Sequence, residues 1–131
     1  MTEFFLPMKR IPTATAQEKQ HAVRGSKIVV YDPEAVKDAS AKFMAALTPY
    51  RPPAPYTGAV RLIVRWCFPR GKNHRDGEYK TTRPDTDNML KLFKDCMTKV
   101  GFWKDDAQVS SELNEKFYAE ISGVYVQVTK L

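Results

Sequence analysis

The residues best suited to chemistry lie between positions 84 and 106. Asp85 and Asp87 follow Pro84, which favours extended backbone in the residue before it. If the chain stays extended through both aspartates, their Cα atoms lie roughly 6.5 Å apart, at about 3.3 Å per residue, and both carboxylates point to one side. Such carboxylates repel each other unless a cation lies between them. Hard oxygen ligands suit Mg²⁺ or Mn²⁺, so the spacing predicts a divalent metal site.

A lysine and a second pair of acids can join this site. Lys91 lies one helical turn after Asp87, so its ammonium can reach the same side as the carboxylates. Asp105 and Asp106 follow a predicted helix and a glycine turn, which is enough chain to return a third carboxylate; spacing does not choose between them. Carboxylates, a metal and a lysine match the needs of metal-assisted phosphodiester hydrolysis.

The same acids also have a purely structural explanation. Asp85 or Asp87 can cap the N-terminus of the following helix, where a carboxylate is stabilised by the helix dipole. The pair Asp105–Asp106 can simply mark a turn. On spacing alone, the catalytic and structural explanations both stay open.

The basic residues are concentrated in the middle of the chain. The formal net charge is +6, from 21 Lys and Arg against 15 Asp and Glu. Residues 51–83 carry a charge as large as that of the whole chain. Clustered Lys and Arg gain free energy by releasing counterions from a phosphate backbone, which favours a polyanionic partner. A solvated basic surface that keeps the protein soluble is the alternative.

Length and composition narrow the class of protein. A chain of 131 residues with 43% hydrophobic and 27% charged residues predicts one globular domain, spanning 1–131. The most apolar stretch, 59–68, is interrupted by Arg61 and Arg65, and Glu3 and Pro7 break the first ten residues. We therefore expect neither a membrane span nor a signal peptide, and a cytoplasmic location.

The two cysteines predict buried, reduced thiols. Cys67 and Cys96 each lie inside an apolar pattern, which argues against a disulfide scaffold. Together with His21 and His74 they could in principle hold zinc in an interaction domain. No two of these four residues have close ligand spacing, so the sequence gives little support to a zinc-stabilised interaction domain.

Hydrophobic periodicity predicts an α+β fold: a small single domain in which two helices pack on a mixed or antiparallel sheet. One helix begins at Asp32–Pro33 and ends before Pro49, and the other contains Met89–Val100 and stops at Gly101. The predicted strands are 3–7, 28–31, 59–68 and a terminal hairpin containing 109–117 and 124–128.

Two irregular segments separate these elements, a polar loop at about 8–27 and a flexible basic loop at about 69–83. On strand 59–68, Arg61 and Arg65 should share the face opposite the core and meet phosphate or solvent. The loop cations expected to hold the backbone phosphates of such a polyanion are Arg70, Lys72, Arg75, Lys80 and Arg83.

Two sequence elements carry a family resemblance. They are Asp-Thr-Asp-Asn-Met-Leu-Lys at 85–91 and Phe-Trp-Lys-Asp-Asp-Ala-Gln-Val at 102–109. Together they resemble the core signature of the RusA-type Holliday-junction resolvases, closely over 84–117 and loosely from 58 to the C-terminus. The match to this family is specific because both sequence elements occur, at the spacing that the family uses.

The resemblance implies a small Mg²⁺-dependent endodeoxyribonuclease, with Mn²⁺ as a possible substitute. Such an enzyme acts as a homodimer on branched DNA, nicking four-way junctions symmetrically in recombination and repair. Carried over by position, Asp85, Asp87 and Asp106 match the metal-binding aspartates, and Lys91 matches the essential lysine.

The N-terminal loop departs from the family pattern, and Lys9 and Arg10 are the candidates there for DNA contact. The dimer could use the exposed face of the terminal hairpin or the Phe102–Trp103 pair. A non-catalytic junction- or single-strand DNA-binding module is the alternative from another class, with Trp66, Tyr79 and Trp103 available for stacking.

Overall fold

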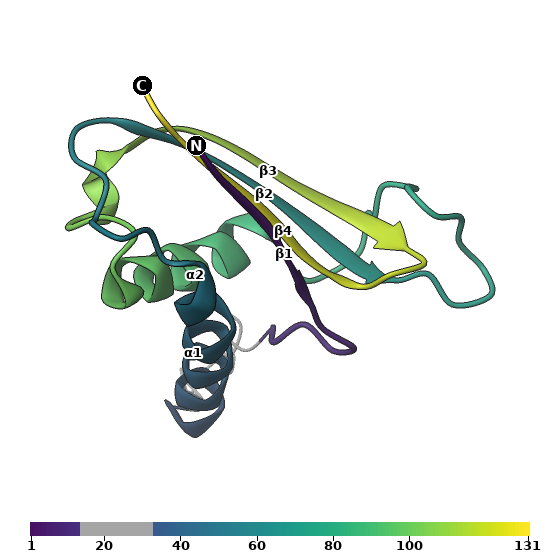
Figure 1. Ribbon diagram of the computed structural model, residues 1–131. Helices are drawn as coiled ribbons and strands as arrows, with labels where there is room; N and C mark the ends of the chain where they lie inside the picture. Colours follow the sequence, from purple (N-terminus) through teal and green to yellow (C-terminus); the bar gives the residue numbers. More distant parts are fainter. Residues whose placement is uncertain (14–32) are drawn as a thin grey trace, which may run out of the picture.

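The computed structural model describes residues 1–13 and 33–131 and shows an α+β fold, as predicted (Figure 1). The predicted strand 28–31 and most of the polar loop 8–27 lie outside the described residues. Two short 3₁₀ turns accompany the main elements, η1 (Thr48–Tyr50) and η2 (Asp106–Gln108). The main elements are β1 (Thr2–Pro7), α1 (Pro33–Leu47), β2 (Val60–Pro69), α2 (Thr86–Val100), β3 (Val109–Ala119) and β4 (Gly123–Lys130).

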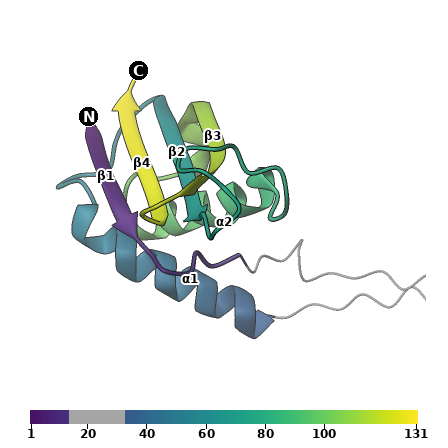
Figure 2. The same cartoon turned by 90° about the vertical axis from the view of Figure 1, so that its right-hand side faces the viewer.

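The four strands form one mixed sheet in the order β1-β4-β2-β3, visible side by side in Figure 2. β4 pairs antiparallel with both β1 and β2, whereas β2 and β3 are parallel. Parallel strands need a crossover connection, and α2 supplies it between β2 and β3. Both helices cover the same face of the sheet (Figure 1), so the other face has no helical cover. No helix within 1–13 and 33–131 is long and apolar enough to cross a membrane.

The core lies between this sheet and the two helices. Alternate residues of β2, namely Leu62, Val64 and Trp66, are fully buried, which confirms the alternation predicted for 59–68. Phe43 of α1, Phe93 of α2 and Trp66 meet one another in edge-to-face contacts, with ring centroids 5.1–6.1 Å apart. Burial of each such side chain stabilises the fold by about 1.5–3 kcal/mol. The apolar core therefore fixes both helices against β2.

The predicted terminal hairpin is wrong, because β2 lies between β3 and β4. The three-residue link 120–122 can span about 10 Å, close to the two strand spacings of about 9.6 Å that it must cross. The buried side chains of β4 (Val124, Val126 and Val128) are all apolar and occupy an interior position of the sheet. β3 instead presents polar side chains on that face, which suits the outer position.

The end of α2 is as predicted. Gly101 has a left-handed φ of 107°, and its N–H donates to the carbonyls of Met97 and Thr98, each at 3.1 Å. The next two residues turn inward: Phe102 is fully buried and Trp103 is 1% exposed. The Trp103 indole N–H donates to the Thr98 hydroxyl at 2.7 Å. Phe102 and Trp103 therefore cannot form the exposed dimer contact expected of them.

We expect Gly123→Ala to destabilise the fold. Gly123 has φ 155°, and an added Cβ would overlap the Leu6 carbonyl oxygen and lie 2.6 Å from the Phe5 ring. Because β1 and β4 must separate to admit it, the free energy of unfolding should fall by at least about 2 kcal/mol in denaturant titrations.

Gly71→Ala is the matched control, since Gly71 also has a positive φ, 61°, but open space around it. It should cost only about 1 kcal/mol. Equal losses for the two variants would contradict the close approach of β1 to Gly123.

Candidate active site

A pocket of about 300 Å³ lies between α2 and the edge strand β3. One face of α2 contributes Asp87, Lys91 and Lys94, which follow one another at helical spacing. Asp106 enters from η2, immediately before β3. The complete lining is Asp87, Leu90, Lys91, Lys94, Asp106, Glu112 and Asn114. Two of the predicted metal-binding aspartates and the predicted lysine therefore meet in one place.

Asp105 and Asp106 have different surroundings. The Asp105 Oδ1 accepts a hydrogen bond from the Ala107 N–H at 2.9 Å, and the Gln108 side chain accepts from the Asp105 N–H at 3.2 Å. This reciprocal capping box begins η2. The structural explanation therefore holds for Asp105, whereas Asp106 lines the pocket.

The spacing argument predicted one extended segment from Asp85 to Asp87, and this prediction is wrong. Asp85 is extended, with φ −74° and ψ 139°, but α2 begins at Thr86, which puts Asp87 in the first helical turn. The Asp85 side chain makes no capping hydrogen bond, so the capping explanation is not met for this residue. Asp85 is also not part of the pocket lining. The pocket thus holds two of the three aspartates predicted to share a metal.

Hydrogen bonds from β3 hold the chain where it enters α2. Asn114 links the sheet to the helix: its Oδ1 accepts from the Trp66 indole N–H at 2.7 Å, and its Nδ2 donates to the Thr86 carbonyl at 2.9 Å. The Lys116 ammonium donates to the carbonyls of Thr82 at 2.7 Å and Pro84 at 2.8 Å. These bonds fix the helix start that carries Asp87 relative to β3.

Sequence reasoning missed four polar residues at this site: Lys94, Glu112, Asn114 and Lys116. Lys94 and Glu112 form an ion pair across the pocket, with Nζ and Oε1 3.0 Å apart. A signal existed in β3, where 112, 114 and 116 are all polar and pair in register with the buried residues 62, 64 and 66. The strand 109–117 was instead predicted from its apolar residues, which include Leu113 and Phe117. Both lie on the face without helices.

The donor chemistry of the pocket fits a hard divalent cation. Within residues 1–13 and 33–131, no three His, Cys, Asp or Glu side chains gather closely enough to complete a metal site by themselves. Asp87 and Asp106 still supply two carboxylates to one pocket. Mg²⁺ is commonly held by one or two carboxylates, with waters and substrate phosphates as further ligands. Two aspartates are therefore a sufficient protein contribution.

The basic loop is more ordered than predicted. Its last part runs beside β3: the Tyr118 N–H donates to the Glu78 carbonyl at 2.8 Å, and the Lys80 N–H donates to the Lys116 carbonyl at 3.1 Å. A hydrogen bond from His74 lowers the pKa of Glu78, so this contact favours the folded loop at neutral pH and is lost as Glu78 protonates in acid. The last part of the loop is therefore hydrogen-bonded to the edge strand β3.

The five loop cations are not equivalent. Arg70 pairs with Glu120. The Lys80 ammonium lies 4.9 Å from the Tyr118 ring centroid and donates to the Thr82 hydroxyl at 2.8 Å. The remaining three cations are exposed and form no ion pair within the described part of the chain, and they are Lys72, Arg75 and Arg83.

The aromatic residues invoked for a stacking module are mostly inaccessible. Trp66 is fully buried and Trp103 is 1% exposed, so neither can stack on a base. Tyr79 is 62% exposed and stacks on Phe117, with ring centroids 4.8 Å apart. The structure thus removes most of the support for a non-catalytic binding module.

Arg61 and Arg65 both lie on the uncovered face of the sheet, as predicted. Both bind β3: the Arg61 Nε donates to the Ser111 hydroxyl at 3.0 Å, and the Arg65 Nε donates to Glu115 at 3.2 Å. Burial raises the pKa of the Cys67 thiol on this face and of the Cys96 thiol in the core. Both thiols therefore stay protonated and are poor metal ligands. His21 lies outside the described residues.

One open pocket is lined by carboxylates and lysines, and the same protein carries exposed cations. This combination suits an enzyme that cuts a phosphodiester backbone. Comparison with known proteins narrows this class. The family model described as Endodeoxyribonuclease RusA matches residues 10–129, and the chain belongs to that family. The resemblance found in residues 84–117 is confirmed, and with it the prediction of an endodeoxyribonuclease rather than a passive binding module.

Two relatives show how much of the chain is shared. The first, named Crossover junction endodeoxyribonuclease rusA, from Lactococcus phage r1t, is 28% identical over 131 residues and covers 98% of both chains. The second, named Uncharacterized protein YqaN, from Bacillus subtilis (strain 168), is 28% identical over 121 residues and covers 84% of both. The similarity therefore extends well beyond the pocket.

Substitution of the two adjacent aspartates should separate stability from pocket chemistry. Asp105→Ala removes the acceptor of the capping box and should lower the free energy of unfolding by about 1 kcal/mol. Asp106→Ala removes a carboxylate that lines an open pocket with other acids, so its stability should stay within about 0.5 kcal/mol of wild type or rise. Urea titration measures both; a larger loss for Asp106→Ala would contradict these assignments.

Proposed function

We propose that this protein is a metal-dependent endodeoxyribonuclease that resolves four-way DNA junctions by paired nicks in recombination and repair. The observation that carries the proposal is the meeting of Asp87, Asp106 and Lys91 in one pocket of a RusA-family chain. The name of the phage relative, a crossover junction endodeoxyribonuclease, supports branched DNA as the substrate.

Asp87 and Asp106 would hold the metal, and Asp85 stays a proposed third ligand on the strength of the family signature. A divalent ion such as Mg²⁺ or Mn²⁺, held by these aspartates, would supply Lewis-acid chemistry: a polarised phosphate and a water of lowered pKa. The ammonium of Lys91 would stabilise the negative charge that grows on the phosphoryl oxygens. The ion pair between Glu112 and Lys94 would keep a second ammonium at the edge of the pocket.

DNA would approach across the basic loop. Lys72, Arg75 and Arg83 are the proposed main phosphate contacts because they form no ion pairs within 1–13 and 33–131. Arg70 and Lys80 stay proposed contacts, although each must first leave or share its partner in the protein. We place this reaction in the cytoplasm.

A homodimer would supply two pockets, and its two-fold axis can match the symmetry of a four-way junction. Each pocket would then cut one of two symmetry-related strands, which accounts for paired nicks without a second type of site.

We expect Asp87→Asn and Asp106→Asn each to slow junction nicking by at least about a thousand-fold, equivalent to ~4 kcal/mol of activation free energy. Each amide removes a negative oxygen ligand but keeps the shape of the side chain. The measurement is single-turnover nicking of a synthetic four-way junction, with duplex and single-stranded DNA as competing substrates, in Mg²⁺ or in EDTA.

Asp105→Asn is the matched control, because asparagine can still accept the capping hydrogen bond. It should nick within about threefold of wild type. Junction binding in EDTA should survive in all three variants. Full nicking by Asp106→Asn would refute the metal-binding role, and equal nicking of junction and duplex by wild type would refute junction selectivity.

Lys91→Met should reduce the nicking rate of fully bound junction by about a hundred-fold or more, since the lost ammonium acts on charge that develops during the reaction. Lys99→Met is its control on the same helix, because Lys99 pairs with Asp95 and does not line the pocket. Lys99→Met should retain the wild-type rate. If the two variants nick equally fast, the charge-stabilising role of Lys91 is wrong.

A further inference from the structure

A second, larger cavity of about 700 Å³ lies between α1 and the chain that follows β1. We call it the α1 groove. Cations from two segments line it: Lys9 and Arg10 after β1, and Lys42 from α1. Ile11 and Phe68 add apolar surface, and Asp38 is the one acid among the described lining residues. Among the described residues, the groove shares no lining residue with the pocket between α2 and β3, which we call the acid pocket.

Helical spacing explains how α1 opens this groove. Ala35, Asp38, Ala39 and Lys42 recur at three- and four-residue steps and so lie on one face of the helix. The two alanines are short, which leaves room between the helix and residues 9–13. Lys42 lies at the end of this row, with its charge beside the cavity rather than in the core.

The charge of the groove favours an anion. Lys9, Arg10 and Lys42 are exposed and form no ion pair with any residue of 1–13 or 33–131. Three cations face one carboxylate, that of Asp38. Cations beside a partly apolar floor suit a nucleic-acid strand, whose phosphates meet the charges while its sugars and bases meet the apolar surface.

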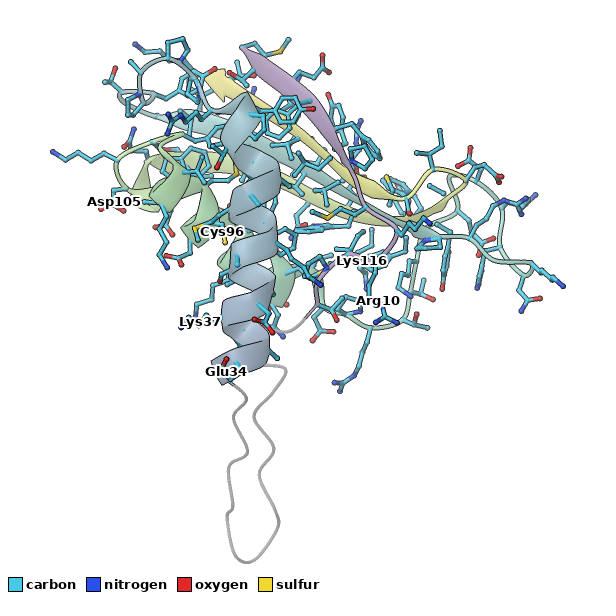
Figure 3. All side chains as sticks on the ribbon, turned by 60° about the horizontal axis from the view of Figure 1, so that its bottom comes forward. Arg10, Glu34, Lys37, Cys96, Asp105 and Lys116 are labelled. Atoms are coloured by element: carbon cyan, nitrogen blue, oxygen red, sulfur yellow. The ribbon has the colours of Figure 1, made fainter. Side chains whose placement is uncertain are left out.

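A chain of contacts leads from the groove to the entrance of α2. The Lys80 ammonium lies 5.2 Å from the ring centroid of Phe68, which lines the groove, and it donates to the Thr82 hydroxyl at 2.8 Å. Thr82 in turn accepts from Lys116, the residue that holds the helix start. In Figure 3, Arg10 and Lys116 lie on the same side of α1, and Lys37 lies on the other side.

We propose that the α1 groove binds backbone phosphates of the DNA strand as it leaves the acid pocket, with Lys42 as a phosphate ligand supplied by α1. The proposal rests on the proposed junction-cutting function. It assigns to α1 a role in substrate binding, separate from its packing against α2.

Lys42→Gln tests the groove, and Lys37→Gln is the matched control, since Lys37 is exposed on the same helix but does not line the cavity. Junction affinity is measured in EDTA at several salt concentrations. Lys42→Gln should weaken binding about five- to tenfold at ~100 mM salt and reduce the salt slope by about 0.7–0.9, the range for one lost phosphate contact on a single strand or a duplex. Lys37→Gln should change affinity less than about twofold.

Nicking of saturated junction in Mg²⁺ separates this proposal from the proposed function. Lys42→Gln should nick bound junction at the wild-type rate, because the acid pocket is intact. Equal affinity and equal salt slope for Lys42→Gln and Lys37→Gln would overturn the groove while leaving the enzyme in place. A wild-type protein that binds junctions but never nicks them would instead overturn the function, and the ratio of the two variants would still decide the groove.

Discussion

The attachment of β3 to the start of α2 is the constraint on which the rest of the site depends. Asn114 joins the Trp66 indole to the Thr86 carbonyl, and Lys116 holds the carbonyls of Thr82 and Pro84. The same strand begins directly after η2, which carries Asp106. One strand edge thus brings together acids from opposite ends of the α2 segment. These side-chain bonds, together with the apolar core, set the position of Asp87 relative to Asp106.

Electrostatic repulsion opposes this arrangement. Asp87, Asp106 and Glu112 line one pocket with two lysines, so the acids outnumber the cations there. Like charges that share a pocket at a protein surface repel one another, and more strongly where less water lies between them. The buried contacts of Trp66 and Phe93 hold the elements in place against that repulsion. The apolar core therefore keeps the acids in one pocket, where a bound cation would offset their repulsion.

The sequence predicts the parts of this fold that depend on local pattern. The alternation along β2 and the αL glycine at the end of α2 are both set by near neighbours in the chain, and both are confirmed. Hydrophobic alternation shows which face of a strand is buried but not which strand lies beside it, so the place of β3 outside β2 was missed. The interior position of β4 becomes clear only when its all-valine inner row is compared with the polar row of β3.

For the site, the sequence signature points to the correct segment but not to its supports. Asp105 and Gln108 have the spacing of a capping box, a local signal that could have separated Asp105 from Asp106 beforehand. For Asn114 and Lys116 the sequence offers only the row of polar residues in β3, because their hydrogen-bond partners lie far away in the chain. The extended backbone predicted from Asp85 to Asp87 is absent for a local reason, because the helix begins between them.

The most direct test of this account is the position of a bound ion. Crystals of the protein grown with Mn²⁺ would locate the metal by its anomalous scattering. We expect an ion within about 2.0–2.3 Å of carboxylate oxygens of both Asp87 and Asp106, with the Asn114 bond to the Thr86 carbonyl intact. An ion held by Asp105, or by neither Asp87 nor Asp106, would contradict it.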